Sequence, residues 1–138
     1  MKKIFTFILF TLIAKQMIAQ ENWQIVLHKK ILLTGTEVSE EKNVRQVKST
    51  DWKKNGFLEI NYKKDPASAW LHSIQLTDAA GNPLLVKDSV TSAKISTSAL
   101  RKLFAGKKEM KIYMVISPPN PMMAAPSRMK HLATLKLP

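Results

Sequence analysis

Apolar and polar residues alternate along much of this chain with a period of two, which is typical of β-strands that bury one face. In the first such segment the apolar residues fall on odd positions: Trp23, Ile25, Leu27, Ile31 and Leu33. We expect residues 23–34 to form one long strand or a bent pair of strands. The alternation also predicts strands at 57–62, directly after the Asn55-Gly56 turn signal, and at 70–77.

The second half of the chain predicts three more strands and one helix. A short apolar run at 84–86 follows a turn, and the almost continuous apolar run at 111–116 is typical of a strand buried on both faces. The last strand, 128–137, is expected to carry five residues on one face: Met129, His131, Ala133, Leu135 and Leu137. A helix is predicted near 98–105, with a serine at its start, an apolar stripe and Gly106 at its end.

Six to eight short strands separated by turn signals, with one short helix, predict an all-β protein. We expect residues 21–138 to form a single β-sandwich, immunoglobulin-like or of a related topology. The Cys-Trp-Cys spacing of immunoglobulin domains is absent from the sequence, so the order of the strands stays open.

Residues 1–20 have the pattern of a secretory signal peptide. Two lysines precede an apolar stretch, Ile4 to Ala14, which Lys15 interrupts and which is short for a membrane-spanning helix. We expect cleavage after Ala19 or Gln20, no transmembrane segment in the remaining chain, and a protein that acts in the periplasm or outside the cell. The Ala-Gln ending followed by an acidic residue also resembles the leaders of exported proteins from Bacteroidota-type Gram-negative bacteria.

The sequence is strongly basic, with 22 Lys and Arg residues against 10 Asp and Glu and a formal net charge of +12. No cysteine is present, which excludes disulfide bonds, thiolate zinc sites and cysteine nucleophiles. The sequence also has no Gly-x-Ser-x-Gly elbow and no glycine-rich phosphate loop. The glutamates at 37, 40 and 41 fall in a charged run, and the aspartates at 51, 65 and 78 lie at turns. We therefore expect a protein that is not an enzyme.

Paired lysines are the main functional signal. Four pairs (29–30, 53–54, 63–64 and 107–108) fall at predicted strand ends or turns, and a tryptophan precedes one pair in a predicted loop. If these ends gather on one side, they form a cationic patch, whose residues would be Lys29, Lys30, Trp52, Lys53, Lys54, Lys63 and Lys64. For an exported protein, the partner would be an anionic glycan, a lipid headgroup or an envelope protein, rather than nucleic acid. A solvated lysine surface that keeps the protein soluble explains the same pairs.

Histidine and methionine offer an alternative site. If the inward faces of three predicted strands converge, they bring together imidazole and thioether groups, a ligand set that suits copper, from His72, Met114, Met129 and His131. The Met-x-His spacing of Met129 and His131 resembles the His/Met dyads of periplasmic copper chaperones. A blue-copper centre is excluded because it needs a thiolate. Methionines that fill gaps in a core, and histidines bonded to backbone carbonyls, explain the same residues without any cofactor.

The C-terminal segment 111–137 is predicted to contain a strand, a proline-bounded corner and a last strand. Residues 117–121 hold three prolines and cannot pair in a central sheet, so they are expected to cross between the two strands. This arrangement resembles the C-terminal halves of small, uncharacterised secreted β-sandwich proteins of Bacteroidota, which implies a fold but no activity. The sequence thus predicts an exported, non-catalytic binding or interaction module with a basic surface, and a periplasmic copper-binding protein as the alternative.

Overall fold

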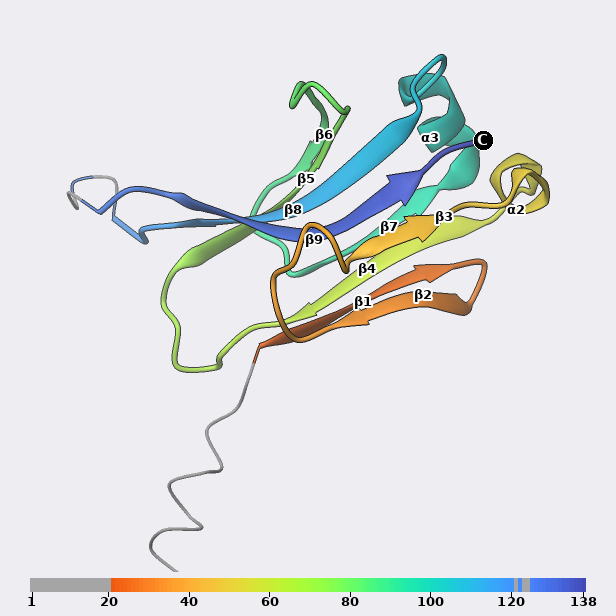
Figure 1. Cartoon of the computed structure of the whole chain (residues 1–138). Helices are drawn as coiled ribbons and strands as arrows, with labels where there is room; N and C mark the ends of the chain where they lie inside the picture. The colour runs from red at the N-terminus through yellow and green to blue at the C-terminus, as the bar shows by residue number, and fades with distance from the viewer. Residues whose placement is uncertain (1–20, 121, 123–124) are drawn as a thin grey trace, which may run out of the picture.

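Two β-sheets packed face to face make up the structure, a computed structural model that describes residues 21–120, 122 and 125–138 (Figure 1). The four-stranded sheet has the order β2-β1-β4-β7, and the five-stranded sheet has the order β3-β9-β8-β5-β6. The all-β sandwich with a short helix is confirmed, with nine strands in the described ranges rather than six to eight. The signal peptide predicted for residues 1–20 lies outside the described residues.

The four-stranded sheet is antiparallel throughout. Its strands are β1 (Asn22–Leu27), β2 (Lys30–Gly35), β4 (Phe57–Lys63) and β7 (Ser92–Ser96). The predicted segment 23–34 is therefore a hairpin, folded by a two-residue turn at 28–29. The apolar pattern does not predict β7, because the two inward positions of this short strand carry a small alanine and a single isoleucine.

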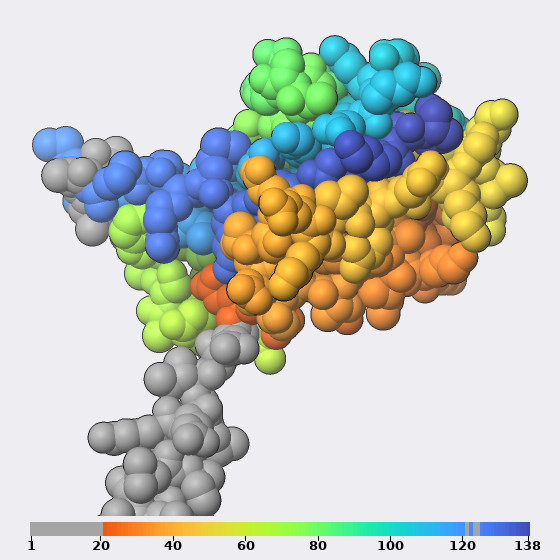
Figure 2. Space-filling view, viewed as in Figure 1, coloured from red at the N-terminus to blue at the C-terminus, as the bar shows by residue number. Residues whose placement is uncertain are grey.

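The five-stranded sheet contains β3 (Val44–Gln46), β5 (Leu71–Thr77), β6 (Pro83–Lys87), β8 (Glu109–Ser117) and β9 (Arg128–Lys136). The proline-bounded corner joins β8 to β9, which form an antiparallel pair that projects from the body of the molecule (Figure 1). β3 pairs with β9 in parallel, and from β3 the Arg45 Nε donates a hydrogen bond to the Leu32 carbonyl oxygen of β2 at 3.0 Å. As the edge strand of its sheet, β3 lies between β9 and β2, where it covers one side of the sandwich (Figure 2).

Trp23 lies in the core between the sheets. Its side chain is fully buried, and its Nε1 donates a hydrogen bond to the Leu132 carbonyl oxygen of the opposite sheet at 3.0 Å. Gly35 is paired with Trp23 in the β1–β2 ladder, and a Cβ at this position would lie 2.2 Å from the indole ring. The glycine therefore leaves the space that the largest core side chain fills.

Two short helices lie at one end of the sandwich (Figure 1). α3 (Thr97–Leu103) confirms the predicted helix, although it begins after Ser96, whose Oγ accepts a hydrogen bond from the Ala99 N–H at 3.2 Å. α2 (Ser49–Lys53) is not predicted, because five residues are too few to show a helical period. Within the described residues, neither helix is long and apolar enough to span a membrane.

Candidate anion-binding site

The predicted lysines separate into two groups at opposite ends of β4. The β1–β2 turn and the end of α2 bring Lys29-Lys30 and Lys53-Lys54 to the beginning of β4 (Figure 1). Lys63-Lys64 lie at its other end, where Lys63 pairs with Asn22 of β1. β4 has seven residues, so the two groups lie about 20 Å apart along the strand. The single patch expected from the sequence is therefore not formed.

A shallow hollow lies at the beginning of β4, with a volume of ≈ 250 Å³. Its lining combines three lysines, a histidine, an asparagine, an aromatic ring, a glycine and one carboxylate, from His28, Lys29, Lys54, Asn55, Gly56, Phe57, Glu59 and Lys94. The lysines come from three separate segments: the β1–β2 turn, the α2–β4 connection and β7. The fold thus gathers cations that are far apart in the sequence.

An exposed aromatic ring lies beside these cations. Phe57 is 47% exposed, and the Lys94 Nζ lies 4.5 Å from the centroid of its ring. A cation at this distance is attracted by the electron-rich face of the ring, which holds the ammonium group over the hollow. The hollow therefore offers both a positive charge and a flat apolar surface to a ligand.

The turn that carries Lys29 has a strained backbone. His28 and Lys29 have φ values of 51° and 65°, so both residues of the turn are left-handed. A two-residue hairpin turn of this handedness fits the twist of its strands, but it strongly favours asparagine and glycine. A histidine and a lysine in these positions cost free energy that other residues would not. Strain of this kind concentrates at functional sites.

His28 fastens this turn to the neighbouring segments. Its Nε2 donates to the Asp51 carbonyl oxygen of α2 at 2.7 Å, and its backbone N–H donates to the Phe57 carbonyl oxygen at 3.1 Å. The ring also packs closely on Gly56, where a Cβ would lie 2.0 Å from the His28 Nδ1. Lys29 is thereby fixed over the hollow through contacts of the residue before it.

Helix α3 fixes the segment that carries Lys54. The Thr97 Oγ1 donates to the Lys54 carbonyl oxygen at 2.7 Å and accepts from the Gly56 N–H at 3.1 Å. Arg101 donates to the Trp52 carbonyl oxygen and to the Asn55 Oδ1, both at 2.8 Å. These bonds position the backbone of the hollow without the side chain of Lys54 itself.

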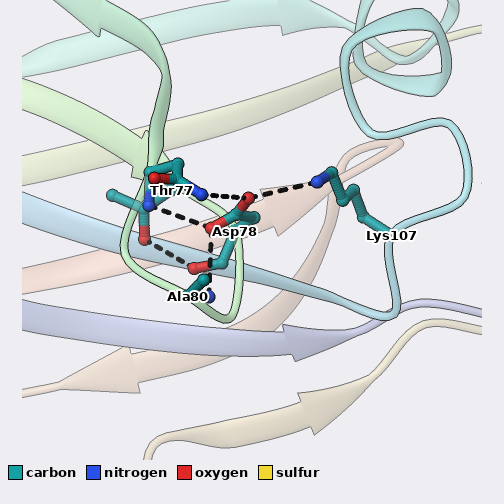
Figure 3. Close-up of polar contacts among 5 residues, drawn as sticks. Thr77, Asp78, Ala80 and Lys107 are labelled. Atoms are coloured by element: carbon teal, nitrogen blue, oxygen red, sulfur yellow. Dashed lines mark hydrogen bonds and ion pairs between the residues drawn. The ribbon is translucent and has the colours of Figure 1, made fainter.

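The lysines of the hollow differ from those that the fold uses internally. Lys107 pairs with Asp78 at 3.2 Å, in a turn that the Asp78 carboxylate also fastens by accepting from the backbone N–H groups of Ala80 and Asn82 (Figure 3). Hydrogen bonds from Asn82, with Lys107 beside them, lower the pKa of Asp78 to about 2. The charge of Lys107 is therefore already paired, with Asp78, within the fold.

Lys130 also forms an ion pair within the fold, at the end of the sandwich opposite the hollow. Its Nζ lies 3.1 Å from the Glu21 Oε2 and 3.1 Å from the Tyr62 oxygen, and 5.1 Å from the centroid of the Trp23 ring. The Tyr62 hydroxyl donates to the same carboxylate, and burial together with this bond raises the pKa of Tyr62. The ion pairs within the described ranges involve only three lysines, Lys107, Lys130 and Lys136, so the hollow keeps its positive charge.

Sequence reasoning found only part of this site. Of the predicted residues, Lys29 and Lys54 line the hollow, while Lys30 and Lys53 are exposed next to it. Trp52 was expected in a loop at the edge of the patch, and this is wrong: it lies in α2 and is partly buried against the core. Phe57 supplies the exposed ring instead, and the alternation of β4, which turns Leu58 and Ile60 inward, could have indicated it.

The structure does not bring the four predicted copper ligands together. His72 and Met114 lie on the core face of the five-stranded sheet, where His72 pairs with Ile116. Met129 pairs with Val115 and is 56% exposed on the outer face, and His131 packs edge-on against Tyr113 on that face. The physical reason is a β-bulge at Leu132, which reverses the alternation within β9. The expected convergence is therefore wrong.

Comparisons with protein-family models, with curated proteins and with solved structures found no significant match.

Proposed function

We propose that this protein is an exported, non-catalytic binding module that holds anionic groups in the hollow at the beginning of β4. The observation that supports the proposal is the meeting of Lys29, Lys54 and Lys94, from three separate segments, beside an exposed ring. Lysines that only keep a surface soluble have no reason to lie together. These three lie around one hollow, and hydrogen bonds from His28 and Thr97 fix the segments that carry Lys29 and Lys54. Glu59 is the one carboxylate in the lining, so the hollow offers binding contacts rather than an acid/base pair.

The physical basis of binding is electrostatic. Three exposed ammonium groups around a shallow hollow attract carboxylate, sulfate or phosphate groups, and this attraction weakens as salt screens it. Phe57 adds an apolar contact that salt does not screen. An anionic polymer should therefore bind with an affinity that falls with ionic strength but does not vanish.

The test is a calorimetric titration of the protein without residues 1–20 with dextran sulfate and with uncharged dextran. We expect binding of dextran sulfate only. The variant Lys29→Gln/Lys54→Gln/Lys94→Gln should lose roughly tenfold or more in affinity, the equivalent of about 1.4 kcal/mol per factor of ten. The control Lys42→Gln/Lys87→Gln/Lys108→Gln removes the same charge from exposed positions away from the hollow. Equal losses in the two variants would contradict a specific site.

A further inference from the structure

A second hollow lies on the outer face of the four-stranded sheet, at the other end of β4. Its volume is ≈ 320 Å³, and it is lined by Asn22, Gln24, Asn61, Tyr62, Lys63 and Ser92, of which Asn22, Gln24 and Asn61 carry side-chain amides and Ser92 a hydroxyl. Asn61 lies opposite both Gln24 of β1 and Ser92 of β7 in the ladders. Three adjacent strands thus present polar side chains at the same level.

The two hollows form one strip along β4. Side chains alternate along a strand, and the outward positions of β4 carry Phe57 and Glu59 in the first hollow and Asn61 and Lys63 in the second. The flanking strand β7 contributes to both hollows in the same way, through Lys94 and Ser92. The strip therefore follows β4 between β1 and β7, for about 20 Å.

The chemistry of the strip matches an acidic sugar chain. Amide side chains both donate and accept hydrogen bonds, so Asn22, Gln24 and Asn61 can each serve sugar hydroxyls, which do the same. The lysines at both ends match carboxylate or sulfate groups, and the exposed face of Phe57 matches the C–H face of a sugar ring. A lipid would need an apolar channel for its chains, and a compact phosphate would contact only the first hollow.

We infer that the ligand is an acidic polysaccharide that lies as an extended chain along β4, with its charged groups on Lys29, Lys54 and Lys94 and its hydroxyls on the amides of the second hollow. The inference rests on the binding function proposed above and deepens it. It requires that binding depend on the length of the sugar chain, since a short piece can occupy only one hollow.

The experiment is a titration with galacturonate oligomers of defined length, from dimer to octamer. Affinity should rise with length and then level off once the chain spans the strip. The variant Gln24→Ala/Asn61→Ala should weaken the octamer several-fold and leave the dimer unchanged, whereas Lys94→Gln should weaken both. Gln75→Ala, on the outer face of the other sheet, is the matched control and should change neither.

Two results would overturn the inference, and they differ in what they say of the binding function. If the dimer and the octamer bind with equal affinity and Lys94→Gln lowers both, the ligand does not extend along β4. The proposal of an anion site in the first hollow would then still hold. Failure of every oligomer and of dextran sulfate to bind would remove both proposals. A side-chain amide signal of Asn61 that shifts in an NMR spectrum with the octamer, but not with the dimer, would support the extended chain directly.

Discussion

Two regions of this molecule use lysine in opposite ways. At one end of the sandwich, Lys130 is 22% exposed in its side chain and contacts Glu21, Tyr62 and Trp23. At the other end, Lys94 reaches over an exposed ring in a hollow that holds one carboxylate and three lysines. The same residue type thus stabilises the fold where it pairs with a carboxylate, and is left available in the hollow, where three lysines surround the single carboxylate of Glu59 and none forms an ion pair with it. We therefore expect lysines that the fold leaves without an ion pair, rather than lysine content, to mark a binding surface.

The largest effect on stability is expected from Lys130→Ala. The substitution removes the stem that packs over Trp23 and Tyr62, and it removes the only cation that pairs with Glu21 among the described residues. We expect a loss of about 2 kcal/mol, or roughly 8 °C in Tm. Lys94→Ala, which gives up only a contact with an exposed ring, should cost less than about 1 kcal/mol. Urea denaturation of both variants measures the difference, and equal losses would refute the comparison.

For binding, the expected order of the same two variants is reversed: Lys94→Ala should lower the affinity for dextran sulfate more than Lys130→Ala. Lys94→Ala is expected to weaken binding of dextran sulfate several-fold, and by less than the triple substitution, because it removes one of three cations of the hollow. Lys130→Ala should bind like the unchanged protein at a temperature where it is fully folded. Calorimetry at low salt measures both affinities. A lower affinity of Lys130→Ala for dextran sulfate would mean that the ligand binds at the end of β4 opposite the hollow, and would contradict the proposed site.

A smaller effect, with opposite signs for stability and binding, is expected from Lys29→Gly. Glycine adopts the left-handed backbone of this turn without strain, so the variant should gain about 0.5–1 kcal/mol in stability. It also removes one cation of the hollow, so the affinity for dextran sulfate should fall. Thermal denaturation and titration of one preparation give both values. A Lys29→Gly variant that is less stable than the unchanged protein would show that the Lys29 side chain stabilises the fold, and would contradict this prediction.

The smallest effect is expected from acid at the Asp78–Lys107 turn. Since the pKa of Asp78 is about 2 in the folded protein and 3.8 otherwise, its contribution to stability is complete above pH 3.8 and is lost as the pH falls toward 2. Asp78→Asn should therefore be less stable than the unchanged protein at pH 5, and the gap should narrow between pH 4 and 2. Urea denaturation across this range measures the gap. A difference in the free energy of unfolding that does not change with pH would mean that the charge of the Asp78 carboxylate does not contribute to stability.

The sequence predicts the sandwich well because its strands bury one face each. The alternation at 57–62 and the apolar run at 111–116 correspond to β4 and β8, whose inward residues include Ile60 and Met114, both fully buried. It predicts the last strand less well, because the bulge at Leu132 changes which residues face inward, and no local signal marks it. The expected convergence of His72, Met114, Met129 and His131 depended on that alternation, and the bulge turns Met129 and His131 to the outer face.

The candidate site was only partly predictable, since it depends on long-range pairing. Lys29 and Lys54 carried a signal as members of lysine pairs at turns. Lys94 carried none, because the sequence does not reveal that β7 pairs with β4 and places Lys94 opposite Glu59. Nor does it reveal that β4 separates Lys63-Lys64 from the other pairs.

The most direct test of the central claim is an NMR titration of the protein, labelled with ¹⁵N, with a short heparin oligosaccharide. We expect the backbone signals that shift most to come from the hollow, at Lys29, Asn55, Phe57 and Lys94, with little change at Lys107 or Lys130. Shifts spread evenly over all exposed lysines, or concentrated at the opposite end of the sandwich, would contradict a specific anion site at the beginning of β4.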